Sequence, residues 1–132
     1  MSTRMPTLDM VSFEQADIEN VLAQLSPEQI DDLPFGAIQL DATGKVLAYS
    51  RREAQITSRD PAQVIGRNFF EEVAPCTRRP EFYGRFQEGV RKGELGVVFD
   101  YTFDYKMNPT RVRVHMKKAI LGDTYWVLVS RR

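Results

Sequence analysis

The chain has 132 residues, 42% of them hydrophobic and 27% charged, a balance typical of one globular domain rather than of a disordered chain. Eighteen basic residues offset eighteen acidic ones, so the formal net charge is zero, which disfavours a nucleic-acid partner. With one cysteine and one histidine, the chain can form neither an internal disulfide nor a structural zinc site. The sequence shows no signal peptide and no apolar run long enough to span a membrane, so we expect a cytoplasmic protein with no membrane partner.

The N-terminal region has the features of two short helices. Ser12 and Ser26 are each followed three residues later by glutamine, the pattern of a capping box, and Pro27 suits a first helical position. Four apolar residues have the spacing of one helical face: Ile18, Val21, Leu22 and Leu25. The sequence therefore predicts two helices between about residues 13 and 32, packed as a cap on an apolar surface.

The next segments predict a hairpin and then a helical region. The stretch GAIQLDATGKVLAYS alternates in hydrophobicity on either side of a turn at DATG. Residues 50–92 are punctuated by prolines, and their clearest helix runs from about Pro80 to Lys92, where Gly93 ends it.

The last third predicts three strands joined by turns at NPT and LGD. Because no helix separates these strands, the sheet is antiparallel and the fold class is α+β. The period of two predicts an apolar, aromatic face and a solvent-exposed face, with His115 and its basic neighbours on the exposed one. The apolar face carries Phe99, Tyr101, Phe103, Tyr105 and Met107.

The single cysteine, Cys76, lies in a loop between Pro75 and Pro80. It is either a small buried apolar residue, an attachment point or a nucleophile. The only candidate base, His115, is predicted on the opposite face, so a cysteine–histidine dyad is disfavoured. No P-loop, dinucleotide or paired-carboxylate motif is present, and we do not expect an enzyme.

The stretch YSRREAQITSRD allows two interpretations of Glu53. Tyr49, Glu53 and Thr57 are spaced by four residues and lie on one helical face, where two hydroxyls and a carboxyl can converge. Ser50 and Glu53 also match a capping box, in which the carboxylate is ionised and near the surface. The local sequence alone favours the capping interpretation.

Several segments together resemble the photoactive yellow protein family of small bacterial blue-light receptors with the PAS fold. The segments are FGAIQLD, RDPAQVIGRNFFEEVAPCT, PEFYG, YTFDY and VHMKKA, and the similarity extends from about Phe13 to the C-terminus. The resemblance implies a central five-stranded antiparallel sheet with helices on one side and an N-terminal helical cap. Residues 1–34 would form the extension and cap, and residues 35–132 the PAS core, in one compact domain.

The resemblance also implies a covalent p-coumaric acid chromophore, joined to Cys76 by a thioester. Tyr49 and Glu53 would hold its phenolate oxygen, Thr57 would support the Tyr49 hydroxyl, and Arg59 would cover the ring. The backbone N–H of Cys76 would bind the thioester carbonyl. The implied lining residues are Ile38, Phe69, Val73, Phe103, Tyr105 and Met107.

The resemblance implies that light isomerises the chromophore from trans to cis, that the phenolate then takes the proton of Glu53, and that partial unfolding at the N-terminal cap is the signal. By resemblance we expect a monomer that signals to an unknown downstream protein. The chain departs from the best-known member of the family, which has glycines at the positions of Ala54 and Ser58 and small residues at those of Arg51 and Arg52.

Two alternatives remain open at this point. One is a PAS-type domain that binds a small ligand non-covalently and leaves Cys76 unmodified. The other is a thiol redox sensor in which Arg78 and Arg79 favour the Cys76 thiolate.

Overall fold

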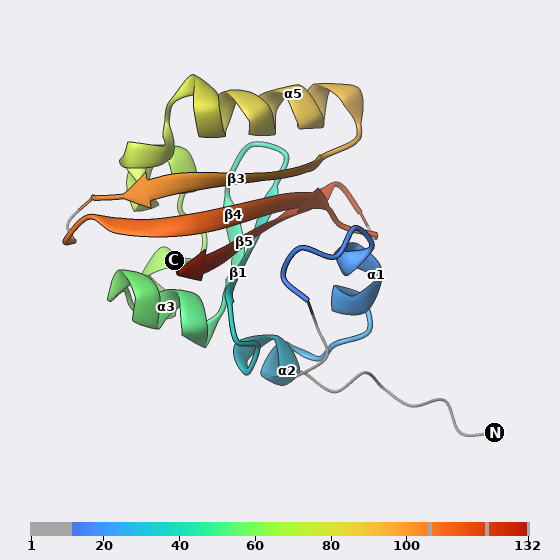
Figure 1. The fold of residues 1–132 in the computed structure, drawn as a ribbon, viewed down its shortest axis with the longest axis horizontal. Helices are drawn as coiled ribbons and strands as arrows, with labels where there is room; N and C mark the ends of the chain where they lie inside the picture. The colour runs from blue at the N-terminus through green and yellow to red at the C-terminus, as the bar shows by residue number, and fades with distance from the viewer. Residues whose placement is uncertain (1–11, 106, 121, 132) are drawn as a thin grey trace.

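The computed structural model describes residues 12–105, 107–120 and 122–131, which fold around one five-stranded antiparallel sheet (Figure 1). The spatial order of the strands is β2-β1-β5-β4-β3, so the C-terminal strand lies at the centre. The prediction of an α+β fold with this type of sheet is confirmed. The strands are β1 (Gly36–Asp41), β2 (Val46–Tyr49), β3 (Gly96–Phe103), β4 (Thr110–Lys118) and β5 (Thr124–Arg131).

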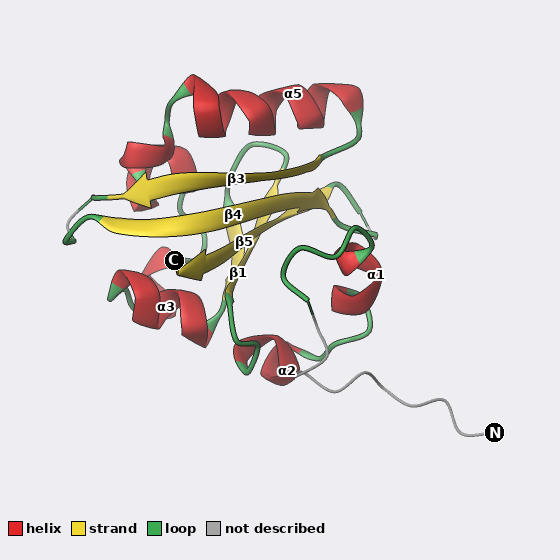
Figure 2. Ribbon diagram, in the orientation of Figure 1, coloured by secondary structure: helices red, strands yellow, loops and turns green. Residues whose placement is uncertain are grey.

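Helical segments between β2 and β3 pack on one face of this sheet (Figure 2). The predicted helix at residues 80–92 is a π-helical segment continued by an α-helix, and it ends at Gly93 in the left-handed conformation, as expected. Phe82 and Phe86 from this helix are buried against the sheet. The segments are α3 (Arg51–Thr57), α4 (Pro61–Val64), η2 (Phe69–Val73), η3 (Pro75–Thr77), η4 (Pro80–Gly84) and α5 (Arg85–Lys92).

Part of the opposite face of the sheet is also buried, under the N-terminal segment, whereas the outer face of β3 is exposed. Along β5, Val127 and Val129 belong to the large core beneath the helices, whereas Trp126 and Leu128 belong to a second, smaller core. Successive residues of a strand point to opposite faces, so one strand contributes to both cores. The buried members of the smaller core, called the cap core below, are Ile18, Leu22, Leu25, Leu33, Phe35, Ala37, Trp126 and Leu128.

The prediction that His115 faces solvent is wrong. Its exposed fraction is 4%, and its Nδ1 lies 2.9 Å from the carbonyl oxygen of Phe13, whose ring packs edge-on against the imidazole. The strand alternation assigned the face correctly, but it could not show that the N-terminal segment covers that face. His115 therefore lies under the cap, on the side of the sheet away from the core that Cys76 joins.

The cap consists of α1 (Ile18–Leu22) and α2 (Pro27–Asp31). The second capping box is complete: the Gln29 N–H donates to Ser26 Oγ at 3.2 Å, and the Ser26 N–H donates to Gln29 Oε1 at 2.9 Å. At the first box only the Ser12 N–H donates, to the Gln15 side chain, and turns follow before the helix begins at Ile18. The predicted start near Phe13 is therefore wrong by about one helical turn.

Alternate residues of β4 bind the segment that precedes and includes α1. Arg113 pairs with Glu14, and Lys117 donates to the Ala16 carbonyl at 2.8 Å and pairs with Glu19 at 3.0 Å. These contacts sit at the rim of the cap core. The N-terminal segment is thus held by a small apolar core and a row of polar contacts to one strand.

Candidate functional site

One narrow cavity, of about 20 Å³, brings together ten of the eleven predicted site residues. It lies between α3, the η2–η3 segment and the end of β3. Ile38 is absent from its wall and instead pairs with Tyr49 inside the large core. Ala74 was not predicted to line it. The lining residues are Tyr49, Glu53, Thr57, Arg59, Phe69, Val73, Ala74, Cys76, Phe103, Tyr105 and Met107.

Two lining residues reach the cavity from an unexpected element. The alternation placed Tyr105 and Met107 on a strand, but β3 ends at Phe103 and both residues follow it in the turn before β4. Lys106, assigned to the other face, lies outside the described residues. The side chains of Tyr105 and Met107 are half-buried, so they form a rim rather than the floor of the cavity.

A chain of hydrogen bonds joins the two hydroxyls at one end of the cavity. Thr57 Oγ1 donates to the Glu53 carbonyl oxygen at 2.9 Å, and the Tyr49 hydroxyl lies 2.7 Å from Thr57 Oγ1. Because threonine has one hydroxyl proton, Tyr49 is the donor in the second bond. Burial, and then the neighbouring Glu53, raise the pKa of Tyr49, so this phenol stays a neutral donor at physiological pH.

Glu53 is the most unusual group in the cavity. Its exposed fraction is 0%, and neither carboxyl oxygen has a hydrogen-bond partner among the residues that the structure describes. Burial raises its pKa from the usual 4.5 to about 8, so the carboxyl is protonated at neutral pH. A buried polar group without a partner costs about 1–3 kcal/mol. The site therefore holds an unused O–H donor that suits a ligand with an acceptor atom.

The capping interpretation of Glu53 is wrong. Ser50 Oγ does accept from the Glu53 N–H, at 3.3 Å, but the Ser50 N–H donates to the Ala37 carbonyl at 2.9 Å and not to the Glu53 carboxyl. The carboxyl instead packs against the backbone of Gly36, where a Cβ atom would lie 2.3 Å from Glu53 Oε2. Only glycine admits so close an approach.

Cys76 also lines the cavity, from the short helix η3. Its side chain is half-buried, and the helix is fixed by Thr77, whose hydroxyl donates to the Ala74 carbonyl at 2.7 Å. The Tyr101 hydroxyl donates to the Cys76 carbonyl at 2.5 Å. Sequence reasoning missed this role of Tyr101, although the alternation had placed it on the correct face.

Tyr101→Phe should loosen the loop that carries Cys76. The variant loses one hydrogen bond, worth about 1 kcal/mol, while the ring keeps its packing. We expect a lower free energy of unfolding by that amount and a faster alkylation of the Cys76 thiol by iodoacetamide. Tyr83→Phe, at a tyrosine whose ring packs on Phe70, is the control. Equal alkylation rates in the two variants would show that Tyr101 does not restrain the loop.

Arg59 closes the cavity beside Tyr49. Its Nη1 donates to the Val73 carbonyl at 2.8 Å, which ties the segment after α3 to the last residue of η2. The guanidinium is near enough to Tyr49 to oppose, by its positive charge, part of the rise in the tyrosine pKa. Arg59 can thus cover the cavity and supply a cation near the phenol.

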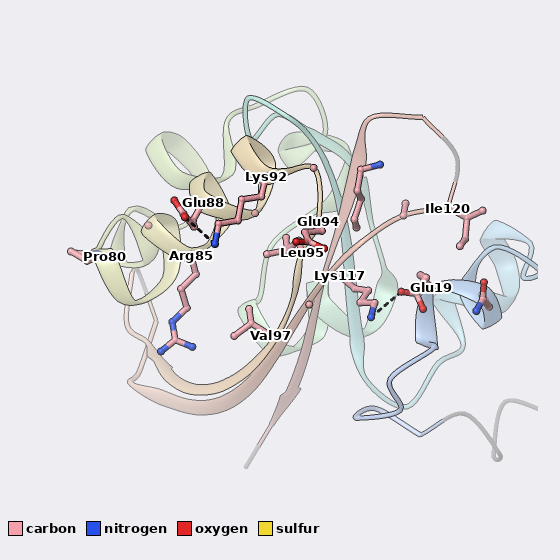
Figure 3. A pocket seen from close by; sticks show the side chains of 17 residues that line it. Glu19, Pro80, Arg85, Glu88, Lys92, Glu94, Leu95, Val97, Lys117 and Ile120 are labelled. Atoms are coloured by element: carbon pink, nitrogen blue, oxygen red, sulfur yellow. Dashed lines mark ion pairs between the residues drawn. The ribbon is translucent and has the colours of Figure 1, made fainter.

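A larger hollow lies elsewhere, as an open groove of about 1150 Å³ between α5, the start of β3 and α1 (Figure 3). Its charges are mixed and partly paired, with Lys92 on Glu88 at 3.3 Å and Lys117 on Glu19 at 3.0 Å. It contains neither Cys76 nor a buried polar group without a partner. Size alone would favour this groove as the functional site, but the thiol of Cys76 and the buried carboxyl of Glu53 favour the narrow cavity.

Comparisons with known proteins show the family of the chain. The family model of the PAS fold matches residues 25–132. The photoactive yellow proteins of Rhodothalassium salexigens and Halochromatium salexigens are 56% and 57% identical over 124 residues, which is 94% of this chain and 99% of each relative. The chain belongs to the photoactive yellow protein family. The relatives' name supports a photoreceptor rather than an enzyme.

A solved structure of the photoactive yellow protein family has the same fold. The photoactive yellow protein domain of the sensor histidine kinase Ppr from Rhodospirillum centenum superposes with a TM-score of 0.81 at 46% identity, covering 85% of this chain and 98% of that domain. That domain is part of a signalling protein, which supports a sensory function for the family fold.

The backbone conformation of Ser58 has a structural cost. Ser58 ends α3 with φ 56° and ψ 40°, the left-handed conformation, and it is the only non-glycine residue with positive φ among those described. Glycine adopts this conformation without the penalty that a Cβ brings, about 1–2 kcal/mol. The helix that carries Glu53 therefore ends at a strained residue.

Proposed function

We propose that the chain is a blue-light photoreceptor that carries p-coumaric acid as a thioester on Cys76. The observation that carries the proposal is that one cavity is lined by the sole thiol and by a buried carboxyl without a partner among the described residues. A phenolate oxygen is the acceptor that the Glu53 O–H lacks. Membership of the photoactive yellow protein family supports the same conclusion.

The cavity residues fit this ligand by their chemistry. Tyr49 and Glu53 are both neutral donors, and two charge-assisted O–H···O⁻ bonds stabilise an ionised phenol in an apolar site. Thr57 supports Tyr49, Arg59 would cover the ring, and the Cys76 N–H would serve the thioester carbonyl. The bound group would supply blue absorption and a double bond that light turns from trans to cis. Phe69, Val73, Phe103, Tyr105 and Met107 supply apolar contacts.

We propose that the signal begins when Glu53 transfers its carboxyl proton to the phenolate oxygen that it would bind, which would leave a neutral phenol and an ionised carboxylate. An ionised carboxylate with no partner is strongly unfavourable there, since its environment is apolar and fully buried. Opening of the protein relieves this cost by admitting water. The N-terminal cap is the part that opens, because it is held by a small core, by polar contacts to β4 and by two contacts from α2 to Arg51.

On this proposal residues 1–34 act as the moving cap and residues 35–132 as the pigmented PAS core, a division that stays a prediction. The chain would pass its signal to a downstream protein, as expected for a fold that occurs within a sensor histidine kinase. No described helix is long and apolar enough to cross a membrane.

The test is to mix the purified chain with an activated p-coumaric acid, such as its anhydride, and to record the absorption spectrum and the intact mass. We expect a yellow protein with one added p-coumaroyl group, lost on treatment with hydroxylamine. Cys76→Ala should fold, gain no mass and stay colourless, because no other thiol is present. Colour without a mass increase would favour non-covalent binding, and a colourless parent with a reactive thiol would favour the redox alternative.

A further inference from the structure

The end of the cap helix α2 contacts the first turn of α3, the helix that carries Glu53. Asp31 Oδ1 accepts a hydrogen bond from the backbone N–H of Arg51 at 2.9 Å, although 20 positions separate the two residues. The neighbouring Asp32 pairs with the Arg51 guanidinium at 3.1 Å. Glu53 follows Arg51 by two positions, so a single helical turn separates the cap from the buried carboxyl.

The first turn of a helix depends on outside acceptors, because its N–H groups have no partners within the helix. In α3, Ser50 Oγ accepts from the Glu53 N–H at 3.3 Å, and it also accepts from the Ala37 N–H at 2.9 Å. Asp31 satisfies the Arg51 N–H. Two contacts thus hold the first turn of α3, which carries Glu53: Ser50 links it to Ala37 of β1, and Asp31 links it to the cap.

We infer that Asp31 is a positioning residue for Glu53, and that its hydrogen bond to the Arg51 N–H couples the protonation of Glu53 to docking of the cap. The inference rests on the proposed function, in which Glu53 is the proton donor. It identifies the Asp31–Arg51 hydrogen bond as the contact through which loss of the Glu53 proton affects the cap. If ionised Glu53 shifts the first turn of α3 towards water, the Asp31 contact is the cap contact that breaks first. Coupling is reciprocal, so release of the cap also makes Glu53 easier to ionise.

The backbone bond, and not the ion pair, carries the coupling. The Arg51 and Asp32 side chains are 62% and 58% exposed, and ion pairs in water contribute little. Arg51→Ala removes that pair but keeps the N–H that Asp31 binds. It is therefore a matched control for Asp31→Ala, which removes the acceptor itself, whereas asparagine caps helices as well as aspartate does.

Other titratable and charged groups surround the same elements. The cap also rests on His115, which meets the Phe13 carbonyl and is unchanged in every variant below. The titratable and charged groups on the helix of Glu53, in the cavity wall and at the end of the cap that meets α3 are Arg51, Arg52, Tyr49, Arg59, Cys76, Tyr105, Asp31 and Asp32. A Glu53→Gln variant keeps all of them and removes only the carboxyl.

The experiment measures amide hydrogen exchange of α1 and α2 in the unpigmented chain at about pH 6 and about pH 8, corrected for intrinsic exchange. In the parent, the opening equilibrium of the cap should rise with pH, by at most about tenfold per unit. Asp31→Ala should raise opening about fivefold at the lower pH and flatten the pH dependence. Asp31→Asn and Arg51→Ala should show the same opening equilibrium and pH dependence as the parent. Glu53→Gln should lose the pH dependence, with an opening equilibrium no higher than that of the parent at the lower pH.

Full pH dependence in Asp31→Ala, or an equally flat response in Asp31→Asn, would overturn the inference. A pH response that persists in Glu53→Gln would assign it to another group, such as His115, and would also overturn it. Because no pigment is used, the result is independent of the p-coumaroyl test. If the chain fails to take up p-coumaric acid but shows these exchange rates, the proposed photoreceptor function is rejected and the inferred role of Asp31 is still supported.

Discussion

Glu53→Gln should make the unpigmented protein markedly more stable relative to the parent at pH 7 than at pH 4.5. The pKa of Glu53 is about 8 in the folded protein and 4.5 for a free carboxyl, so the unfolded chain loses its proton first as pH rises. The parent therefore loses stability from about pH 4.5 up to about pH 8, by at most about 1.4 kcal/mol per unit. At pH 7 this amounts to about 3 kcal/mol, an order-of-magnitude value for a fully buried group.

Glutamine removes this loss because its amide does not titrate in the same range. The cost of burying an amide without a partner is independent of pH, so the difference between variant and parent isolates the carboxyl. Urea unfolding at several pH values measures it, with Glu71→Gln, at an exposed glutamate, as the control. Parallel stability curves for Glu53→Gln and the parent would mean that Glu53 is ionised in the folded state.

The same variant tests the proton donor once pigment is attached. Glutamine still offers an N–H to the phenolate, so the pigment should stay coloured, with a modest red shift because an amide is a weaker donor. In the parent, the light-minus-dark infrared spectrum should show the loss of a protonated carboxyl band, and in Glu53→Gln this loss should be absent. A parent spectrum without a carboxyl loss would contradict the assignment of Glu53 as donor.

Gly36→Ala should displace Glu53 from the cavity. The new Cβ would lie 2.3 Å from Glu53 Oε2 and 3.0 Å from Glu53 Cβ, so either the carboxyl swings away or α3 moves off β1. Overpacking of this kind costs about 1–3 kcal/mol. With its donor misplaced, the pigmented variant should hold its phenolate less well, and the pH at which the colour bleaches should rise.

Gly84→Ala is the matched control for this substitution. Gly84 has helical dihedral angles, φ −60° and ψ −41°, and its nearest neighbour to an added Cβ is 3.7 Å away. Alanine there should leave both the unfolding free energy and the acid bleaching close to those of the parent, or raise stability slightly. If Gly36→Ala behaves like Gly84→Ala in both measurements, close packing against Gly36 does not hold Glu53 in place.

Sequence patterns predicted the helices and strands because interactions between residues close in sequence determine where these elements begin and end. The Ser26 capping box, the stop at Gly93 and the alternation in β3 all depend on residues within one turn or one strand. The face of His115 was predicted correctly but its exposure was not. What covers a strand depends on a segment 102 residues away, and no period in the strand encodes it.

The site was harder to predict from its residues alone. The spacing of Tyr49, Glu53 and Thr57 showed that they share a helical face, but the capping pattern at Ser50 gave the wrong environment for Glu53. Its burial is decided by Gly36, which lies 17 positions earlier on another element. Likewise, Tyr101 meets the Cys76 carbonyl 25 positions away. Only the family resemblance, which combines many distant positions, predicted most of the residues that line the cavity.

The two cores on either side of the sheet give the molecule two cooperative units of unequal size. β5 belongs to both, yet its backbone pairs with β1 and β4 regardless of what covers its outer face. The cap core can therefore melt while the sheet and the large core persist, and Trp126, the sole tryptophan, would report that event alone. Unfolding followed by Trp126 fluorescence should then precede unfolding followed by backbone circular dichroism, so one melting temperature would not describe this protein.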